Sequence, residues 1–90
     1  MSIGEILERV IDICKHFGIQ EVILFGSWAK GTANEFSDVD IAIKGAEDIE
    51  RLREAIEEIP TLRSFDIVDV DNCKNELLLK EIEQYGRKIL

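Results

Sequence analysis

The sequence lacks an apolar run of the roughly 20 residues that a membrane-spanning helix needs, and its amino end lacks the features of a secretion signal. Basic residues are also scarce, because 11 lysines and arginines face 19 aspartates and glutamates, for a formal charge of -8. Proteins that bind nucleic acid on their own usually carry a basic surface, so this composition disfavours that class. We therefore expect a cytosolic protein that contacts neither membranes nor nucleic acid directly.

Cysteine is scarce too, and the two thiols form no recognisable site. Cys14 and Cys73 belong to no CxxC pair and have no histidine at ligand spacing. This argues against a zinc site or a disulfide framework, so we expect both to be small buried core residues. The 90 residues contain no repeat, low-complexity stretch or linker, and 46% of them are apolar, which predicts a single domain over residues 1–90.

Helical and extended apolar patterns alternate along the chain. Apolar residues at three- and four-residue steps predict a helix over 3–17, ended by Gly18, and another over 49–59, stopped by Pro60. The remaining predicted segments are strands over 21–25, 38–44 and 65–70, a short helical turn over 27–30, and a tail over 87–90.

A last helix is predicted from its flanking residues. Asp71 and Asn72 are favourable N-terminal caps, and Gly86 ends the pattern. Its buried face would consist of Leu78, Ile82 and Tyr85. The order of elements is then αβαβαβα, which indicates an α/β (α+β) domain.

The lengths of the connections predict how the strands pair. Only twelve residues, 26–37, separate the first two strands, which is short for a parallel crossover and favours an antiparallel pair. The connection over 45–64 carries a helix and allows the second and third strands to run parallel. We therefore expect a small mixed three-stranded sheet flanked by helices. The end of the first strand and the starts of the other two would meet at one edge of it.

Three carboxylates would gather at this edge. Asp38 and Asp40 leave one face of the second strand about 6 to 7 Å apart, and they repel each other unless a cation lies between them. For the third carboxylate, Asp66 begins the third strand level with Asp40. Asp69 would lie about 10 Å farther along on the opposite face, and Asp71 is better suited to capping a helix. Such oxygen ligands suit Mg²⁺, and two ions about 3.5 to 4 Å apart would bind the attacking and leaving oxygens of a phosphoryl transfer.

Gly26 and Ser27 follow the first strand and form a candidate phosphate site. The glycine lets a phosphate approach the backbone, and the short helical turn and the serine hydroxyl supply donors. Lys30 would add a positive charge, although a solvated surface lysine explains it equally well. Taken alone, the Gly-Ser pair is typical of a turn and the Asp-x-Asp pair of a solvated strand edge. Their joint placement at the ends of apolar strands favours a site over a merely solubilising acidic surface.

Three stretches resemble the signature of the DNA polymerase β-like nucleotidyltransferase superfamily, namely Gly26-Ser27-Trp28-Ala29-Lys30-Gly31, Ser37-Asp38-Val39-Asp40-Ile41-Ala42-Ile43 and Phe65-Asp66-Ile67-Val68. Length and element order are similar to those of the minimal nucleotidyltransferase (MNT) family over nearly the whole chain. The resemblance implies transfer of AMP from ATP, with pyrophosphate leaving. It implies that Gly26 and Ser27 bind the triphosphate. The three acids Asp38, Asp40 and Asp66 would hold two Mg²⁺ ions and carry the catalysis.

The same resemblance implies a partner protein. Many MNT proteins are antitoxins that adenylylate a tyrosine of a helical HEPN-domain ribonuclease, and others pair with a helical substrate-binding subunit. One departure is Trp28, where the family often has arginine, so contacts of Trp28 and Tyr85 with nucleotide or with partner both stay open. A chain of 90 residues has little left to build a wall for the acceptor, which favours a second chain there.

The leading hypothesis is an ATP- and Mg²⁺-dependent nucleotidyltransferase that acts as an antitoxin by adenylylating a helical partner. Two alternatives stay open: a non-catalytic antitoxin or regulatory module, and the nucleotide-binding subunit of a two-chain enzyme that acts on a small molecule. The intact set of three acids favours catalysis, because clustered carboxylates destabilise a fold that binds no metal. The sequence does not decide the acceptor, the base preference or whether the chain associates with itself.

Overall fold

The computed structural model describes all residues, 1–90, which form a mixed α/β fold. Its helices are α1 (Ile3–His16), α2 (Gly26–Lys30), α3 (Ile49–Glu57) and α4 (Glu76–Tyr85), with a 3-10 turn, η1 (Val70–Asn72). Its strands are β1 (Glu21–Phe25), β2 (Val39–Lys44), β3 (Phe65–Asp69) and β4 (Arg87–Lys88). None of the helices has the length and apolar character needed to cross a membrane.

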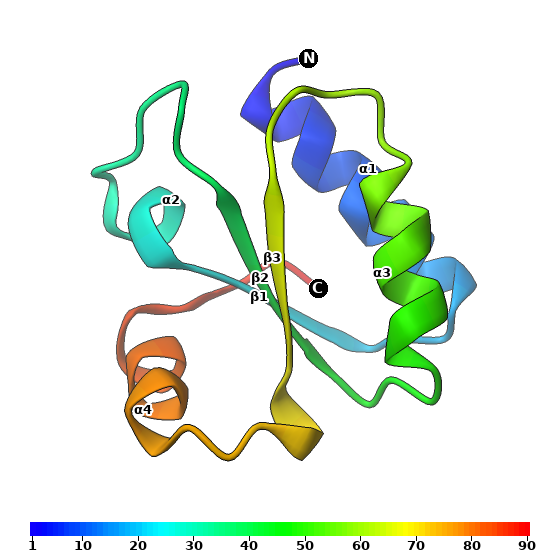
Figure 1. Ribbon diagram of the computed structural model, residues 1–90, viewed down its shortest axis with the longest axis vertical. Helices are drawn as coiled ribbons and strands as arrows, with labels where there is room; N and C mark the ends of the chain where they lie inside the picture. Colours follow the sequence, from blue (N-terminus) through cyan, green and yellow to red (C-terminus); the bar gives the residue numbers. More distant parts are fainter.

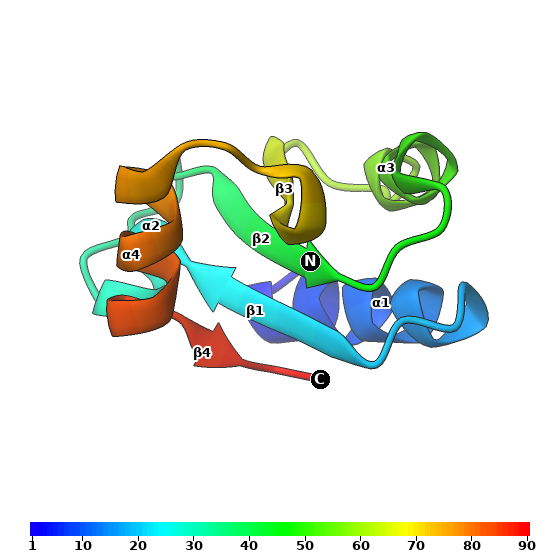
Figure 2. The same ribbon diagram turned by 90° about the horizontal axis from the view of Figure 1, so that it is seen from below.

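The sheet has the strand order β3-β2-β1-β4. The predicted antiparallel pairing of β1 with β2 and parallel pairing of β2 with β3 are both confirmed. The prediction of three strands is wrong by one, because the expected tail forms β4 and pairs antiparallel with Ile23 and Leu24 of β1 (Figure 2). Without β4, the backbone groups along the outer edge of β1 would have no partner in the sheet. Beyond β4, the Val22 oxygen accepts from the Ile89 nitrogen and the Val22 nitrogen donates to the Leu90 oxygen, both at 2.8 Å.

The main core lies between one face of the sheet and the helices α1 and α3, which Figure 1 shows on the same side. Its fully buried members include Ile6, Val10, Cys14, Val39, Ile41, Ile43, Leu52 and Ile56. Phe17, the last residue of the helix predicted over 3–17, lies just beyond the end of α1 and is 41% exposed. Burial is confirmed for Cys14, whereas Cys73 is only half-buried because it follows η1 at the surface.

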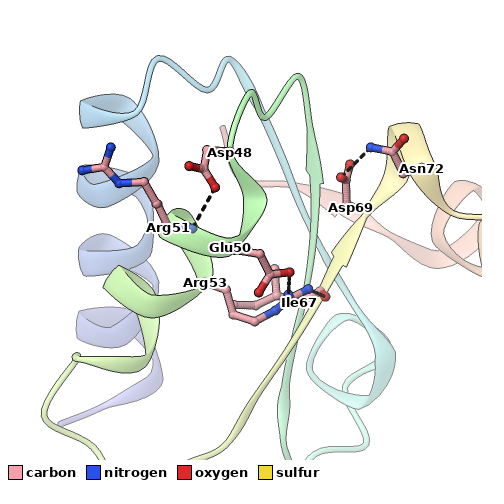
Figure 3. A network of polar contacts seen from close by, with 7 residues as sticks. All are labelled: Asp48, Glu50, Arg51, Arg53, Ile67, Asp69 and Asn72. Atoms are coloured by element: carbon pink, nitrogen blue, oxygen red, sulfur yellow. Dashed lines mark hydrogen bonds and ion pairs between the residues drawn. The ribbon is translucent and has the colours of Figure 1, made fainter.

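Helix α3 is attached to the sheet by polar contacts as well as by packing (Figure 3). Asp48 caps its first turn by accepting from the Arg51 nitrogen at 3.2 Å. Arg53 donates to the backbone oxygen of Ile67 in β3 at 3.1 Å and to Glu50 at 2.6 Å. Of these contacts, the bond from Arg53 to Ile67 joins α3 to β3, and the other two stabilise the first turns of α3 itself.

Helices α2 and α4 lie on the opposite side of the sheet (Figure 1), over a smaller core of Phe25, Ala42 and Ile82. The predicted capping of α4 is wrong: Asn75 caps it by accepting from the Leu78 nitrogen at 3.2 Å. Asp71 instead accepts from the Gly45 nitrogen at 2.7 Å. Tyr85 is also not a core residue, since it is 49% exposed.

Candidate active site

A row of residues crosses three strands at one end of the sheet. Asp40 of β2 lies opposite Phe25, the last residue of β1, and opposite Asp66 of β3. Directly opposed residues share a face, so the two carboxylates leave the same side of the sheet, as the sequence predicted. This is the side that also carries α2 and α4, because Ala42, two residues after Asp40, packs against Ile82 of α4. Asp38 immediately precedes β2, and both Asp38 and Asp66 are exposed.

The other two candidates for a third carboxylate lie elsewhere. Asp69 is opposite Ile43, at the far end of β2, and accepts a hydrogen bond from the Asn72 side chain at 2.8 Å (Figure 3). Asp71 is bonded to Gly45. The structure therefore brings only Asp66 level with Asp40.

Gly26 connects this row to α2 through a close approach of backbone and carboxylate. Its φ of 69° lies in the left-handed region, which glycine adopts at little cost. A Cβ atom at this position would overlap the carboxylate of Asp40. On the sequence alone, the reason for glycine here is that it lets a phosphate approach the backbone. The structure adds a second reason, because a side chain at this position would collide with the Asp40 carboxylate.

The charges that shift the pKa of Asp40 are all negative. The pKa of its carboxyl is raised from 3.8 to about 6, most of all by burial and then by the negative charges of Asp66, Asp38 and Glu81, in that order. Glu81 of α4 is a participant that the sequence did not indicate, because nothing in its local pattern separates it from a solvated helix residue. A cation bound beside Asp40 would reduce the repulsion between these carboxylates.

The residues present fit a divalent cation in kind. Carboxylate oxygens are the ligands that Mg²⁺ prefers, and the field at Asp40 is negative. The side chains do not converge as a finished cage, since no group of three or more Asp, Glu, His or Cys side chains lies close enough together to hold an ion. Mg²⁺ often takes only one or two protein carboxylates and fills its shell with water and substrate phosphate, so this spread is compatible with such a site.

Lys30 ties α2 to α4. Its ammonium group forms an ion pair with Glu81 at 2.5 Å and lies 4.9 Å from the centre of the Tyr85 ring. The hydrogen bond to Glu81 raises the pKa of Lys30. Lys30 is thus an exposed lysine with a defined partner, and the pattern of the sequence could not show this partner, which lies 51 residues away.

Arg63 joins three segments of the site and was not identified from the sequence. Its guanidinium lies 5.0 Å from the centre of the Trp28 ring in α2 and donates to the Glu35 oxygen at 2.9 Å. A longer bond of 3.5 Å reaches the Asn34 oxygen. Arg63 itself belongs to the segment that leads to Asp66. It therefore links α2, the loop before Asp38 and the beginning of β3.

We expect Arg63→Ala to lower the free energy of unfolding by about 2 kcal/mol, because charged hydrogen bonds and a cation–π contact are lost together. Trp28 is the single tryptophan, so its emission reports this contact directly and should move to longer wavelength with more quenching by acrylamide. Arg9→Ala removes the same charge from an exposed position on α1 and should change neither quantity. Unchanged Trp28 emission in Arg63→Ala would contradict the stacking.

Comparison with known proteins identifies the family. The sequence model of the family described as Polymerase beta, Nucleotidyltransferase matches residues 8–90 of this chain. Putative protein adenylyltransferase MJ0435 of Methanocaldococcus jannaschii is 34% identical over 64 residues, which cover 66% of this chain and 69% of that protein. Putative protein adenylyltransferase MJ1305 of the same organism is 46% identical over 44 residues, which cover 46% of this chain but only 30% of that protein.

Solved structures show the same fold. A crystal structure of a toxin-antitoxin with AMP-PNP has a TM-score of 0.69 at 23% identity, over 93% of this chain and 72% of that one. A crystal structure of the toxin-antitoxin MntA-HpeT with two aspartate-to-glutamate substitutions has a TM-score of 0.68 at 21% identity, with the same coverage. The fold and a sequence match that extends over nearly the whole chain show that this protein belongs to the polymerase beta nucleotidyltransferase family, as its motifs predicted.

Proposed function

We propose that this protein transfers AMP from ATP to a hydroxyl group of a second protein, with Mg²⁺ as its cofactor. The observation that carries the proposal is the position of Asp40. Its carboxylate lies against Gly26, opposes Asp66 across the sheet, and is surrounded by negative charge. A triphosphate bound at Gly26 would therefore lie next to cations bound at Asp40 and Asp66.

Each residue of the candidate active site has a role in the proposed reaction. Gly26 and Ser27 bind and orient the triphosphate. Two Mg²⁺ ions, held by Asp38, Asp40 and Asp66, would neutralise the triphosphate and stabilise the charge that develops during displacement. Asp66, which is exposed, accepts the proton of the acceptor hydroxyl. The acceptor oxygen bonds to the α-phosphorus as the bond from that phosphorus to pyrophosphate breaks.

Lys30 would complete the triphosphate site by exchanging partners. Its ammonium now pairs with Glu81, and both side chains are about one-third exposed, at 37% and 36%. Such a partly solvated pair is weak, and a triphosphate carries more negative charge than one carboxylate. ATP would therefore compete with Glu81 for Lys30.

The names of similar proteins support a protein acceptor. Two relatives are named protein adenylyltransferases, and two structures of the same fold are toxin-antitoxins, one of them with AMP-PNP. We accordingly propose a helical HEPN-type toxin as partner, a tyrosine of that toxin as acceptor, and an antitoxin role for this chain. We also propose the cytosol as the location of the reaction, because the reaction requires ATP and this partner.

A second candidate is the nucleotide-binding subunit of a two-chain nucleotidyltransferase for a small molecule. The observation that favours it is the exposure of Asp38 and Asp66, which leaves these two carboxylates open to a small acceptor. A binding-only antitoxin is the third. The three candidate functions differ in the acceptor of AMP, which is a protein in the first, a small molecule in the second and absent in the third.

The test uses the proposed partner, a helical HEPN-type protein, incubated with ATP, Mg²⁺ and this chain. We expect the intact mass of that protein to rise by one AMP unit on a tyrosine, with pyrophosphate released and no inorganic phosphate. Asp40→Asn serves as the control and should leave the mass unchanged, because it removes a proposed metal ligand. A stable complex of unmodified partner with the wild-type chain would overturn the catalytic proposal and support the binding-only antitoxin.

A further inference from the structure

A groove of about 500 Å³ lies beside Asp38. Glu35 and Phe36, in the segment that leads into β2, line one side of it, and Leu62 and Arg63, in the segment that leads into β3, line the other. This volume falls within the range of sites that receive a ligand or a few side chains. Because Asp38 belongs both to the groove and to the acidic site, the two are continuous.

Hydrogen bonds hold the two walls of the groove in place. Arg63 donates across it to the Glu35 oxygen at 2.9 Å, and the Val39 nitrogen donates to the Ser64 oxygen at 2.9 Å. Within the first wall, the Asn34 side chain accepts from the Phe36 nitrogen at 2.8 Å. The groove is therefore formed before anything binds to it, which lowers the entropy cost of binding.

Two large apolar side chains stand at its rims without cover. Phe36 is 86% exposed and Leu62 is 106% exposed. A single exposed apolar residue is ordinary, but here one stands on each wall of the same groove. A partner that filled the groove would remove both from water, and aromatic side chains in such positions often dominate binding energy.

The charge of the groove selects among its occupants. Glu35 and Asp38 are negative, Arg63 keeps its positive charge while it donates to a backbone oxygen and contacts Trp28, and the protein as a whole carries a formal charge of -8. A second copy of this chain carries a charge of -8 and would be repelled, and so would free ATP. A basic partner is attracted by the same field.

We propose that this groove is the docking surface of the acceptor protein. Its occupant is a basic segment of that protein with apolar side chains, which packs against Phe36 and Leu62 and brings the acceptor hydroxyl to the end of the sheet that holds Asp38 and Asp66. The inference rests on the proposed function and adds the place and the chemistry of acceptor recognition.

The test compares three single variants in binding and in transfer. Phe36→Ser and Leu62→Ser shorten exposed side chains at the groove, while Leu77→Ser does the same to an 81% exposed leucine of α4, at the other end of the molecule (Figure 1). Calorimetry with the proposed helical HEPN-type partner should show about tenfold weaker binding for each groove variant and no change for Leu77→Ser. Glu35→Lys should also weaken the complex, and added salt should weaken the wild-type complex.

The outcomes separate the docking surface from the transfer reaction. Equal binding by all three serine variants overturns the docking surface, even if AMP is still transferred. A groove-dependent complex without AMP transfer supports the docking surface and contradicts the proposed function. A changed ATP affinity in Phe36→Ser would place nucleotide in the groove, and a wild-type dimer that this variant dissociates would place a second copy there. Either result, or no wild-type complex at all, overturns the proposal.

Discussion

Asp40→Asn is expected to make the metal-free protein more stable at pH 7 and to abolish its response to Mg²⁺ and ATP. Asp40 has a pKa of about 6 instead of 3.8, so the folded state disfavours the charged carboxylate that predominates at pH 7. Allowing for the partial exposure of the group, relief of this cost should be worth about 1 kcal/mol. That corresponds to a melting temperature higher by about 4 to 8 °C in a domain of this size.

The size of this effect depends on pH in a defined way. A carboxyl with a raised pKa costs nothing below its ordinary value, and its cost grows as pH rises from 3.8 to about 6. The advantage of Asp40→Asn should therefore vanish near pH 4 and be complete above pH 6. Asp12→Asn, at an exposed position on α1, removes the same charge and should show neither effect.

With Mg²⁺ and ATP the order of stability should reverse. A ligand at 100 times its dissociation constant stabilises the folded wild type by about 2.7 kcal/mol, whereas Asp40→Asn lacks a proposed ligand and should gain little. Thermal melts with and without Mg²⁺ and ATP measure both effects on the same samples. Equal ligand-induced shifts in wild type and Asp40→Asn would remove Asp40 from the metal site.

Gly26→Ala should destabilise the protein and block nucleotide binding, whereas Gly31→Ala should only destabilise it. Both glycines have left-handed backbones, with φ of 69° and 77°, so alanine costs about 1 to 2 kcal/mol at either position. At Gly26 the new Cβ atom also overlaps the Asp40 carboxylate, whereas nothing lies within 4 Å at Gly31. Displacement of Asp40 should add about 1 kcal/mol or more and disturb the proposed metal ligand.

The pair of variants isolates crowding from backbone strain. Denaturant unfolding gives the two free energies, and the melting shift with Mg²⁺ and ATP gives ligand binding. We expect the shift to persist in Gly31→Ala and to disappear in Gly26→Ala. If both variants lose the same stability and keep the shift, the close approach of Gly26 and Asp40 has no part in the site.

The sequence by itself determined the elements with a strong local pattern and the edge at which their polar residues meet. The periodic apolar residues of α1 and the alternation along β2 are local signals, and they were read within one or two residues of the observed bounds. The short connection after Phe25 predicted the antiparallel pairing that places Gly26 beside Asp40, and the helical connection over 45–64 allowed the parallel pairing that places Asp66 beside Asp40.

Only the tertiary structure decided the contacts that join distant segments. The two charged residues of β4 have no strand pattern, and they form a strand because the edge of β1 offers free backbone groups. Lys30 meets Glu81, and Arg63 meets Trp28, across separations that periodicity cannot detect. The pKa of Asp40 likewise depends on its burial and on a charge from α4. Local sequence thus fixed which residues stand at the edge, and long-range packing fixed their charge partners and their surroundings.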